Sequence, residues 1–175
     1  MRGFCSSIGR MAVGLVAVAA VGQALAADDL AALAKRVQVL EDREDIRALI
    51  LAYGQAHDHR DYRTFSNLFA SNGEWVGGLG SAKGPQAIFE LMDKTIGHNP
   101  LPNGSGTYHV MTNDQIKIDG DRASATTKWI YITPGETNKP TLVFLGHYED
   151  QFIREKGEWK FLRREAPADI PAAAP

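Results

Sequence analysis

The second half of the chain contains long segments in which apolar and polar residues alternate, and this pattern constrains the fold most. It predicts strands at residues 107–112, 114–119, 122–133, 141–155 and 158–164. The short connections "DGD" at 119–121 and "EKGE" at 155–158 are typical of hairpins. Long strands joined in this way form an antiparallel meander.

The first half has helical periodicity. Apolar residues recur at helical spacing over residues 28–57, and Asp61 is suited to cap a short helix over 61–70. "EWVGGLG" predicts a strand that ends in a glycine turn. A further helix begins at Pro85 and stops at Gly97, and a Pro- and Gly-rich loop follows at 98–106. Helices followed by strands predict an α+β fold, in which a curved sheet around the helices leaves a conical pocket open at one end.

Both ends of the chain are biased in composition. Arg2 and Arg10, the apolar stretch after them and the cleavage pattern Ala24-Leu25-Ala26 predict a cleavable signal peptide over residues 1–26. A periplasmic or secreted location, with no membrane association after cleavage, follows from this prediction. "APADIPAAAP" predicts a flexible C-terminal tail at 166–175, which leaves one domain at 27–165.

Charge and composition exclude several classes of function. Loss of Arg2 and Arg10 with the signal peptide leaves 17 basic against 21 acidic residues, so no nucleic-acid partner is expected. The only cysteine, Cys5, would leave as well, which excludes thiol chemistry in the mature chain. Phosphate-binding loops, nucleophile elbows and zinc-protease motifs are absent from the sequence. Histidine–aspartate acid–base chemistry without a cofactor is the main catalytic option left.

The stretch "AYGQAHDHRD" at 52–61 is the densest cluster of chemically active side chains. On a helix His57 and His59 point about 200° apart, so we expect no shared metal ion and assign both to the rim or surface. Tyr53 and Asp58 lie five residues apart and could edge one cavity at the helix end. In the alternative interpretation, Asp58 is a solvated residue and Tyr53 belongs to the core.

Two further histidines lie in predicted strands. Alternation places His109 on one face with Thr107 and Met111, among apolar groups that suit a general base; a structural histidine is the alternative. Alternation places Tyr148 inside and turns His147 outward, so His147 ranks below His109. The candidate substrate-binding residues are Trp75, Tyr131, Tyr148 and His147, whereas Trp129 is assigned to the core.

Three segments together resemble the SnoaL-like branch of the NTF2-like superfamily: residues 40–75, "YHVMTNDQIKIDGDRASATT" and "GHYEDQFIREKGEWKFLRRE". The resemblance implies a cone of helices packed in a curved antiparallel or mixed sheet, usually without a cofactor and commonly as a dimer or trimer. It matches Asp58 and His109 to a catalytic aspartate and histidine, and Tyr53 to a pocket tyrosine. The second histidine of the superfamily's dehydratases is absent near Tyr131, which could supply a phenol instead.

The sequence therefore predicts a cofactor-independent lyase of dehydratase type that acts on a small hydrophobic, oxygenated molecule such as an aromatic or steroid-like alcohol. His109 would remove a proton, Asp58 would orient it, and Tyr53 or Tyr131 would assist the leaving oxygen. The alternative is a non-catalytic periplasmic protein that binds a small molecule or acts as an accessory. Hydrogen bonding between His109 and Asp58 inside a pocket discriminates between the two.

Overall fold

A computed structural model of the chain describes residues 9–97, 106–135 and 139–171, with side chains from Asp28 onward. Residues 1–8 of the predicted signal peptide, the predicted loop at 98–105 and residues 172–175 of the predicted tail lie outside this description. Two compact units divide the chain, residues 1–41 and residues 42–175, and the second contains the sheet. Within the described part, none of the helices combines the length and apolar character that would let it cross a membrane.

The described residues form three helices and seven strands, which confirms the α+β prediction. In chain order they are α1 (Gly9–Asp58), α2 (Tyr62–Asn67), β1 (Phe69–Gly77), β2 (Gly80–Lys83), α3 (Pro85–Ile96), β3 (Tyr108–Asp119), β4 (Arg122–Pro134), β5 (Pro140–Glu155), β6 (Glu158–Ala166) and β7 (Ala168–Ile170).

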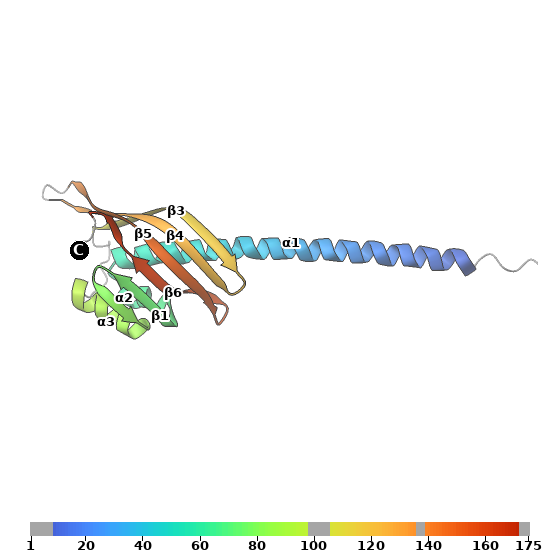
Figure 1. Cartoon of the computed structure of the whole chain (residues 1–175), viewed down its shortest axis with the longest axis horizontal. Helices are drawn as coiled ribbons and strands as arrows, with labels where there is room; N and C mark the ends of the chain where they lie inside the picture. Colours follow the sequence, from blue (N-terminus) through green and yellow to red (C-terminus); the bar gives the residue numbers. More distant parts are fainter. Residues whose placement is uncertain (1–8, 98–105, 136–138, 172–175) are drawn as a thin grey trace, which may run out of the picture. The chain divides into compact units, whose positions relative to one another are not determined.

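The strands form one curved, mixed sheet in the order β2-β1-β6-β5-β4-β3, with β7 paired to β5 (Figure 1). Only β1 and β6 run parallel among the described pairs; the other neighbours are antiparallel. Both predicted hairpins are present. In the β5–β6 turn, Lys156 and Gly157 have φ of 55° and 88°, as a two-residue turn between twisted strands requires.

The strands differ from the sequence prediction in two places. Residues 107–112 and 114–119 were predicted as two strands, but β3 runs through both segments. Its register on β4 shifts between Thr112 and Gln115, and Asn113 there has φ of 57°, so a bulge takes the place of a turn. The predicted flexible tail is wrong for Ala168–Ile170, because these residues pair with β5.

The two predicted helix starts are confirmed. Asp61 caps α2 by accepting a hydrogen bond of 3.0 Å from the backbone N–H of Thr64, and Pro85 occupies the first turn of α3. However, α2 ends at Asn67, and Phe69 and Ala70 already belong to β1. The helices α2 and α3 pack against each other and beside β1, so they cover the sheet next to that strand (Figure 1).

Buried side chains from the end of α1, from α2 and from α3 meet those of the sheet in a single core. The face of α1 that carries Ile46, Ile50 and Tyr53 is buried at helical spacing. The sheet contributes alternate residues, such as Tyr148 and Phe152 on β5. The core is therefore built as the two periodicities predict.

A buried ion pair lies within this core. Arg164 on β6 and Asp150 on β5 are cross-strand partners, and Arg164 donates two hydrogen bonds, of 2.7 and 2.6 Å, to the two carboxylate oxygens. Both side chains are fully buried. The guanidinium also stacks on three aromatic rings, with its central carbon 4.0 Å from the ring centroids of Tyr53 and Tyr148 and 4.2 Å from that of Phe161.

We predict that Asp150→Ala lowers the free energy of unfolding by about 3–5 kcal/mol, because it leaves a buried guanidinium without its counter-charge. Urea denaturation measures this loss. The double variant Asp150→Leu, Arg164→Met removes both charges and should recover most of the lost stability. A single variant that loses less than about 1 kcal/mol would show that Arg164 is solvated rather than paired.

Candidate active site

The last residue of α1 and the start of β3 meet through a histidine–aspartate pair. His109 Nδ1 lies 2.7 Å from Asp58 Oδ1, and the backbone N–H of His109 donates to Asp58 Oδ2 at 2.9 Å. The hydroxyl of Thr107 donates to Oδ1 at 3.3 Å. Because a carboxylate accepts at Nδ1, the proton of a neutral His109 lies on Nδ1, and Nε2 carries the free lone pair.

His109 of this pair lines a pocket of about 670 Å³, and Asp58 holds it from behind the lining. The Asp58 carboxylate and the His109 ring are largely buried, at 15% and 9% exposure of the side chain. The ring of His109 contacts two other rings, with centroid distances of 4.6 Å to His57 and 4.8 Å to Tyr131. Most of the lining is apolar or backbone: His57, Trp75, Val76, Gly77, Gly78, Leu79, Ile96, His109, Trp129, Tyr131, Phe144, Glu165, Ala166, Pro167 and Ala168.

A glycine lets the strand approach the helix at this point. A Cβ on Gly54, one turn before Asp58, would lie 2.6 Å from the methyl carbon of Met111 and 3.4 Å from Cβ of His109. The absence of a side chain at Gly54 therefore leaves room for the inward face of β3, which carries both residues.

Tyr53 lies behind the pocket wall and does not line it. Its hydroxyl accepts a hydrogen bond of 2.9 Å from the indole N–H of Trp75, which does line the pocket. Burial raises the pKa of Tyr53 above its ordinary value, although the charge of Arg164 opposes that shift. Tyr53 therefore remains a neutral phenol that holds Trp75. The prediction that Tyr53 lies at the pocket mouth is wrong.

Of the four residues predicted to bind substrate, Trp75 and Tyr131 line the pocket, and Tyr148 and His147 do not. Tyr148 is 2% exposed and stacks on Trp129, with ring centroids 5.7 Å apart. It supports the pocket from within the core. Trp129, which was assigned to the core, is 8% exposed and also lines the pocket.

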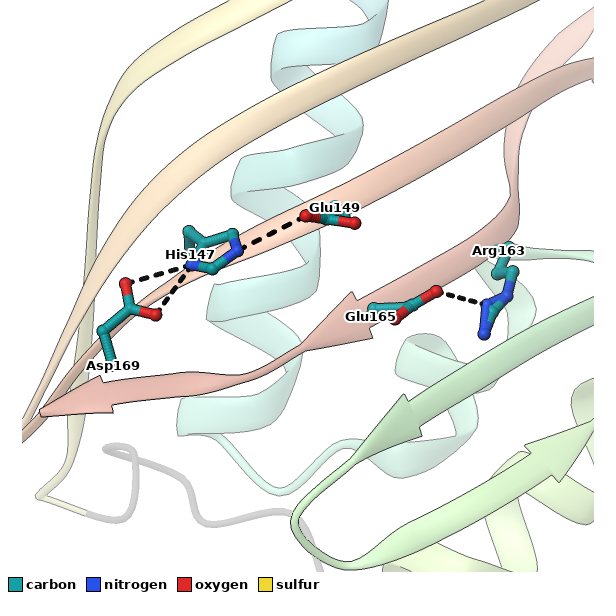
Figure 2. Close-up of polar contacts among 5 residues, drawn as sticks. All are labelled: His147, Glu149, Arg163, Glu165 and Asp169. Atoms are coloured by element: carbon teal, nitrogen blue, oxygen red, sulfur yellow. Dashed lines mark hydrogen bonds and ion pairs between the residues drawn. The ribbon is translucent and has the colours of Figure 1, made fainter. Parts of the chain in front are cut away.

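His147 points away from the core, as the alternation of β5 predicts. Figure 2 shows its ring between Asp169 and Glu149, with Nδ1 2.9 Å from Asp169 Oδ1 and Nε2 3.5 Å from Glu149 Oε1. The hydrogen bond to Asp169 is the main cause that raises the pKa of His147. Since Asp169 belongs to β7, this contact attaches β7 to β5.

The segment between β6 and β7 forms part of the pocket wall, which sequence reasoning missed. Ala166, Pro167 and Ala168 line the pocket, and a Cβ at Gly146 would collide with the carbonyl oxygen of Pro167 and the ring of Trp129. Gly146 pairs with Ala168 across the strands. A glycine in the middle of a predicted strand was the available signal for such a close approach.

His57 was assigned to the rim or surface, and that assignment is wrong. Its ring lines the pocket and packs edge-on against His109, Tyr62 and Phe65. Helical spacing contained the signal, because His57 lies four residues after Tyr53 and so shares its inward face. Burial, and then the nearby His109, lower the pKa of His57 from 6.5 to about 3.

His57, Asp58 and His109 each offer a ligand atom, and these atoms all lie within 4.8 Å of one another. This set differs from the pair of His57 and His59, for which helical geometry predicts no shared metal ion. However, both carboxylate oxygens of Asp58 already accept hydrogen bonds from His109. A cation bound to Asp58 would have to compete with those hydrogen bonds, so the contacts fit an acid–base pair better than a metal centre.

The curved sheet and its helices define an NTF2-like fold, and comparisons with known proteins agree. A solved NTF2-like protein with a cystatin-like fold from Novosphingobium aromaticivorans has 29% sequence identity and a TM-score of 0.71 over 81% of this chain and 90% of its own. A search of curated proteins found no match.

Two further structures share the fold at lower identity. One is a scytalone dehydratase candidate from Novosphingobium aromaticivorans, with 21% identity and a TM-score of 0.61 over 74% of this chain and 85% of its own. The other is a hexachlorocyclohexane dehydrochlorinase, LinA-type3, from Novosphingobium barchaimii, with 21% identity and a TM-score of 0.62 over 74% and 88%. The sequence model of the SnoaL-like domain matches residues 38–165. The chain belongs to the SnoaL-like family.

We predict that His57 makes stability depend on pH below neutrality. The pKa of His57 is about 3 in the folded chain and near 6.5 when unfolded, so between these values the unfolded chain binds a proton that the folded chain does not. The contribution of His57 is fully present above pH 6.5 and is lost as pH falls toward 3. As pH falls from 6.5 toward 3, the free energy of unfolding measured in urea should therefore fall by a few kcal/mol less in His57→Gln than in wild type.

His59→Gln is the control for loss of a histidine from the same helix end, because His59 is exposed and bonds only to the carbonyl of Gln55 among the described contacts. It should follow the wild-type curve. Equal pH dependence in wild type and His57→Gln would contradict the burial of a neutral His57.

We also predict that Gly146→Ala destabilises the chain by about 1–3 kcal/mol, because the added methyl group must displace Pro167 or Trp129. Gly78→Ala is the matched control, since a Cβ there meets nothing within 4 Å and the backbone is not left-handed. Urea denaturation of both variants measures the difference. A Gly146→Ala variant as stable as Gly78→Ala would show that the wall at Pro167 moves freely.

Proposed function

We propose that the protein is a cofactor-independent lyase that removes a proton from a small, largely hydrophobic, oxygenated molecule. The observation that carries this proposal is the 2.7 Å contact between His109 and Asp58 at the wall of a mostly apolar pocket. A base buried beside an apolar pocket works without competition from bulk water, and a carboxylate that holds Nδ1–H strengthens the base at Nε2.

The roles follow from the positions of the side chains. His109 accepts the proton at Nε2, and Asp58 fixes the tautomer and stabilises the imidazolium that forms. Tyr131, which lines the pocket and whose ring centroid lies 4.8 Å from that of His109, is the candidate acid. It is a better candidate than Tyr53, whose hydroxyl is already engaged by Trp75 behind the pocket wall.

In a dehydration, the electron pair of the broken C–H bond forms a C=C bond while the neighbouring C–O bond breaks. Tyr131 protonates the departing oxygen, so water leaves, and the proton on His109 later returns to the tyrosinate. Isomerisation and C–C cleavage begin with the same proton transfer. The dehydrochlorination named for the Novosphingobium barchaimii protein is also a loss of a proton and a leaving group, which supports this class of reaction.

The pocket supports the substrate class. Its volume of about 670 Å³ is that of a typical small-molecule site. Leu79, Ile96 and Phe144 offer apolar contacts, and the polar groups include the tyrosine, the two histidines and Glu165. A ring system with one or two oxygen substituents, such as an aromatic or steroid-like alcohol, matches this lining.

The base can be tested without the natural substrate by ring opening of 5-nitrobenzisoxazole. Removal of its C–H proton forms a nitrile and breaks the N–O bond, which releases a coloured phenolate. We predict that His109→Ala lowers the rate by about 100-fold or more, the usual size of a general-base contribution. Asp58→Asn should lower it by about 10-fold or more, because the tautomer is no longer held.

His147→Ala is a matched control, since it removes a histidine paired to an aspartate outside the pocket. It should leave the rate within about twofold of wild type, and so should treatment with a chelator. A folded His109→Ala variant with near-normal turnover would refute the assignment of the base. A wild-type chain that binds the probe without accelerating its opening would instead favour the binding-protein alternative.

A further inference from the structure

His57 is the histidine of the pocket that the proposed proton transfer does not use. Its ring centroid lies 4.6 Å from that of His109, and the ring centroid of Tyr131 lies 4.8 Å from the same ring. The back of the His57 ring packs against Tyr62 and Phe65, each at 5.8 Å between centroids. Because these aromatic contacts fix the ring, His57 presents a defined edge to the pocket that it lines.

The surroundings of Nδ1 indicate which ring nitrogen of His57 carries the proton. Its Nδ1 is buried and has no hydrogen-bond partner among the described residues. A neutral imidazole carries one N–H and one lone pair. A buried N–H without a hydrogen-bond partner costs more free energy than a buried lone pair without one. The lone pair therefore lies on Nδ1 and the proton on Nε2, which becomes the donor that His57 can offer.

The environment keeps this donor neutral. Burial, followed by the neighbouring His109, lowers the pKa of His57 to about 3. Its Nε2–H can therefore donate a hydrogen bond at neutral pH without becoming a competing base or a charged acid. A neutral imidazole that polarises an oxygen atom is an established way to stabilise developing negative charge.

We propose that His57 is a catalytic hydrogen-bond donor that binds an oxygen atom of the substrate beside His109. The substrate class is thereby narrowed to molecules in which a carbonyl group lies next to the carbon that carries the acidic C–H bond. When His109 takes the proton, the C–H electron pair forms a C=C bond and the carbonyl electrons move onto oxygen. The Nε2–H of His57 holds that oxygen and keeps its own proton.

This inference rests on the proposed function for the role of His109, but binding tests it without turnover. The probe is 4-nitrophenolate, which carries an oxyanion on an apolar ring, and nitrobenzene is the matched probe without that oxygen. Spectroscopic titration gives the dissociation constant of each probe for wild type, His57→Gln and His57→Leu. Glutamine retains an N–H donor near the position of Nε2, whereas leucine offers none.

We expect His57→Leu to bind 4-nitrophenolate about 10-fold more weakly than wild type, the usual loss of one hydrogen bond to a charged group. Nitrobenzene affinity should stay within about twofold in both variants, and His57→Gln should recover part of the phenolate affinity. These results would support the donor role whether or not 5-nitrobenzisoxazole is turned over.

Three results would overturn the proposal. Equal losses for both probes would show that His57 only shapes the pocket, and unchanged phenolate affinity in His57→Leu would show that no hydrogen bond is made. Phenolate binding that disappears with a chelator and returns with Zn²⁺ would assign His57, Asp58 and His109 to a metal ion instead. If His109→Ala does not slow ring opening, only the assignment of His109 as the base is contradicted. The hydrogen bond from His57 to an oxyanion is measured by binding and does not depend on that assignment.

Discussion

The buried ion pair between Arg164 and Asp150 is the interaction on which the arrangement of the pocket depends. It joins β5 to β6 in the core, and the guanidinium stacks on Tyr53, which belongs to α1. Two charges taken out of water need well-aligned partners, and Asp150 supplies both carboxylate oxygens. The position of Tyr53 is fixed in this way, and Tyr53 in turn holds the indole of Trp75 at the pocket wall.

A second polar link holds the two residues of the proposed acid–base pair together. Asp58 closes the last turn of α1, and its carboxylate accepts from both the ring and the backbone of His109. One side chain therefore fixes the start of β3 and the tautomer of the ring that β3 carries. Since both oxygens are engaged, the carboxylate has little freedom to rotate, and the lone pair at Nε2 keeps one direction. The same four hydrogen-bonding atoms of His109 and Asp58 hold the helix end to the strand and fix the tautomer that the proposed proton transfer needs.

Local pattern was sufficient for much of this fold, and non-local contacts explain the rest. The cap at Asp61, the turn at Lys156 and the inward face of His109 all follow from periodicity or turn chemistry. Only the family resemblance suggested that Asp58 and His109 work together, because fifty residues of chain separate them. The burial of Arg164 could not be predicted, since a charged residue on a strand is usually solvated. The angle between His57 and His59 on a helix bears only on a metal ion shared by these two residues. It does not indicate the position that His57 takes beside His109 in the pocket.

The C-terminal strand has a consequence for how relatives of this protein diverge. The family domain ends at residue 165, yet Ala166, Pro167 and Ala168 close one side of the pocket. The proposed base and its aspartate lie inside the domain, whereas this part of the wall lies beyond it. A change in the length or composition of the tail would therefore reshape one side of the pocket while the proposed proton-transfer groups stay as they are. Part of the pocket wall is encoded in a stretch of the chain separate from those groups, and each can be engineered without the other.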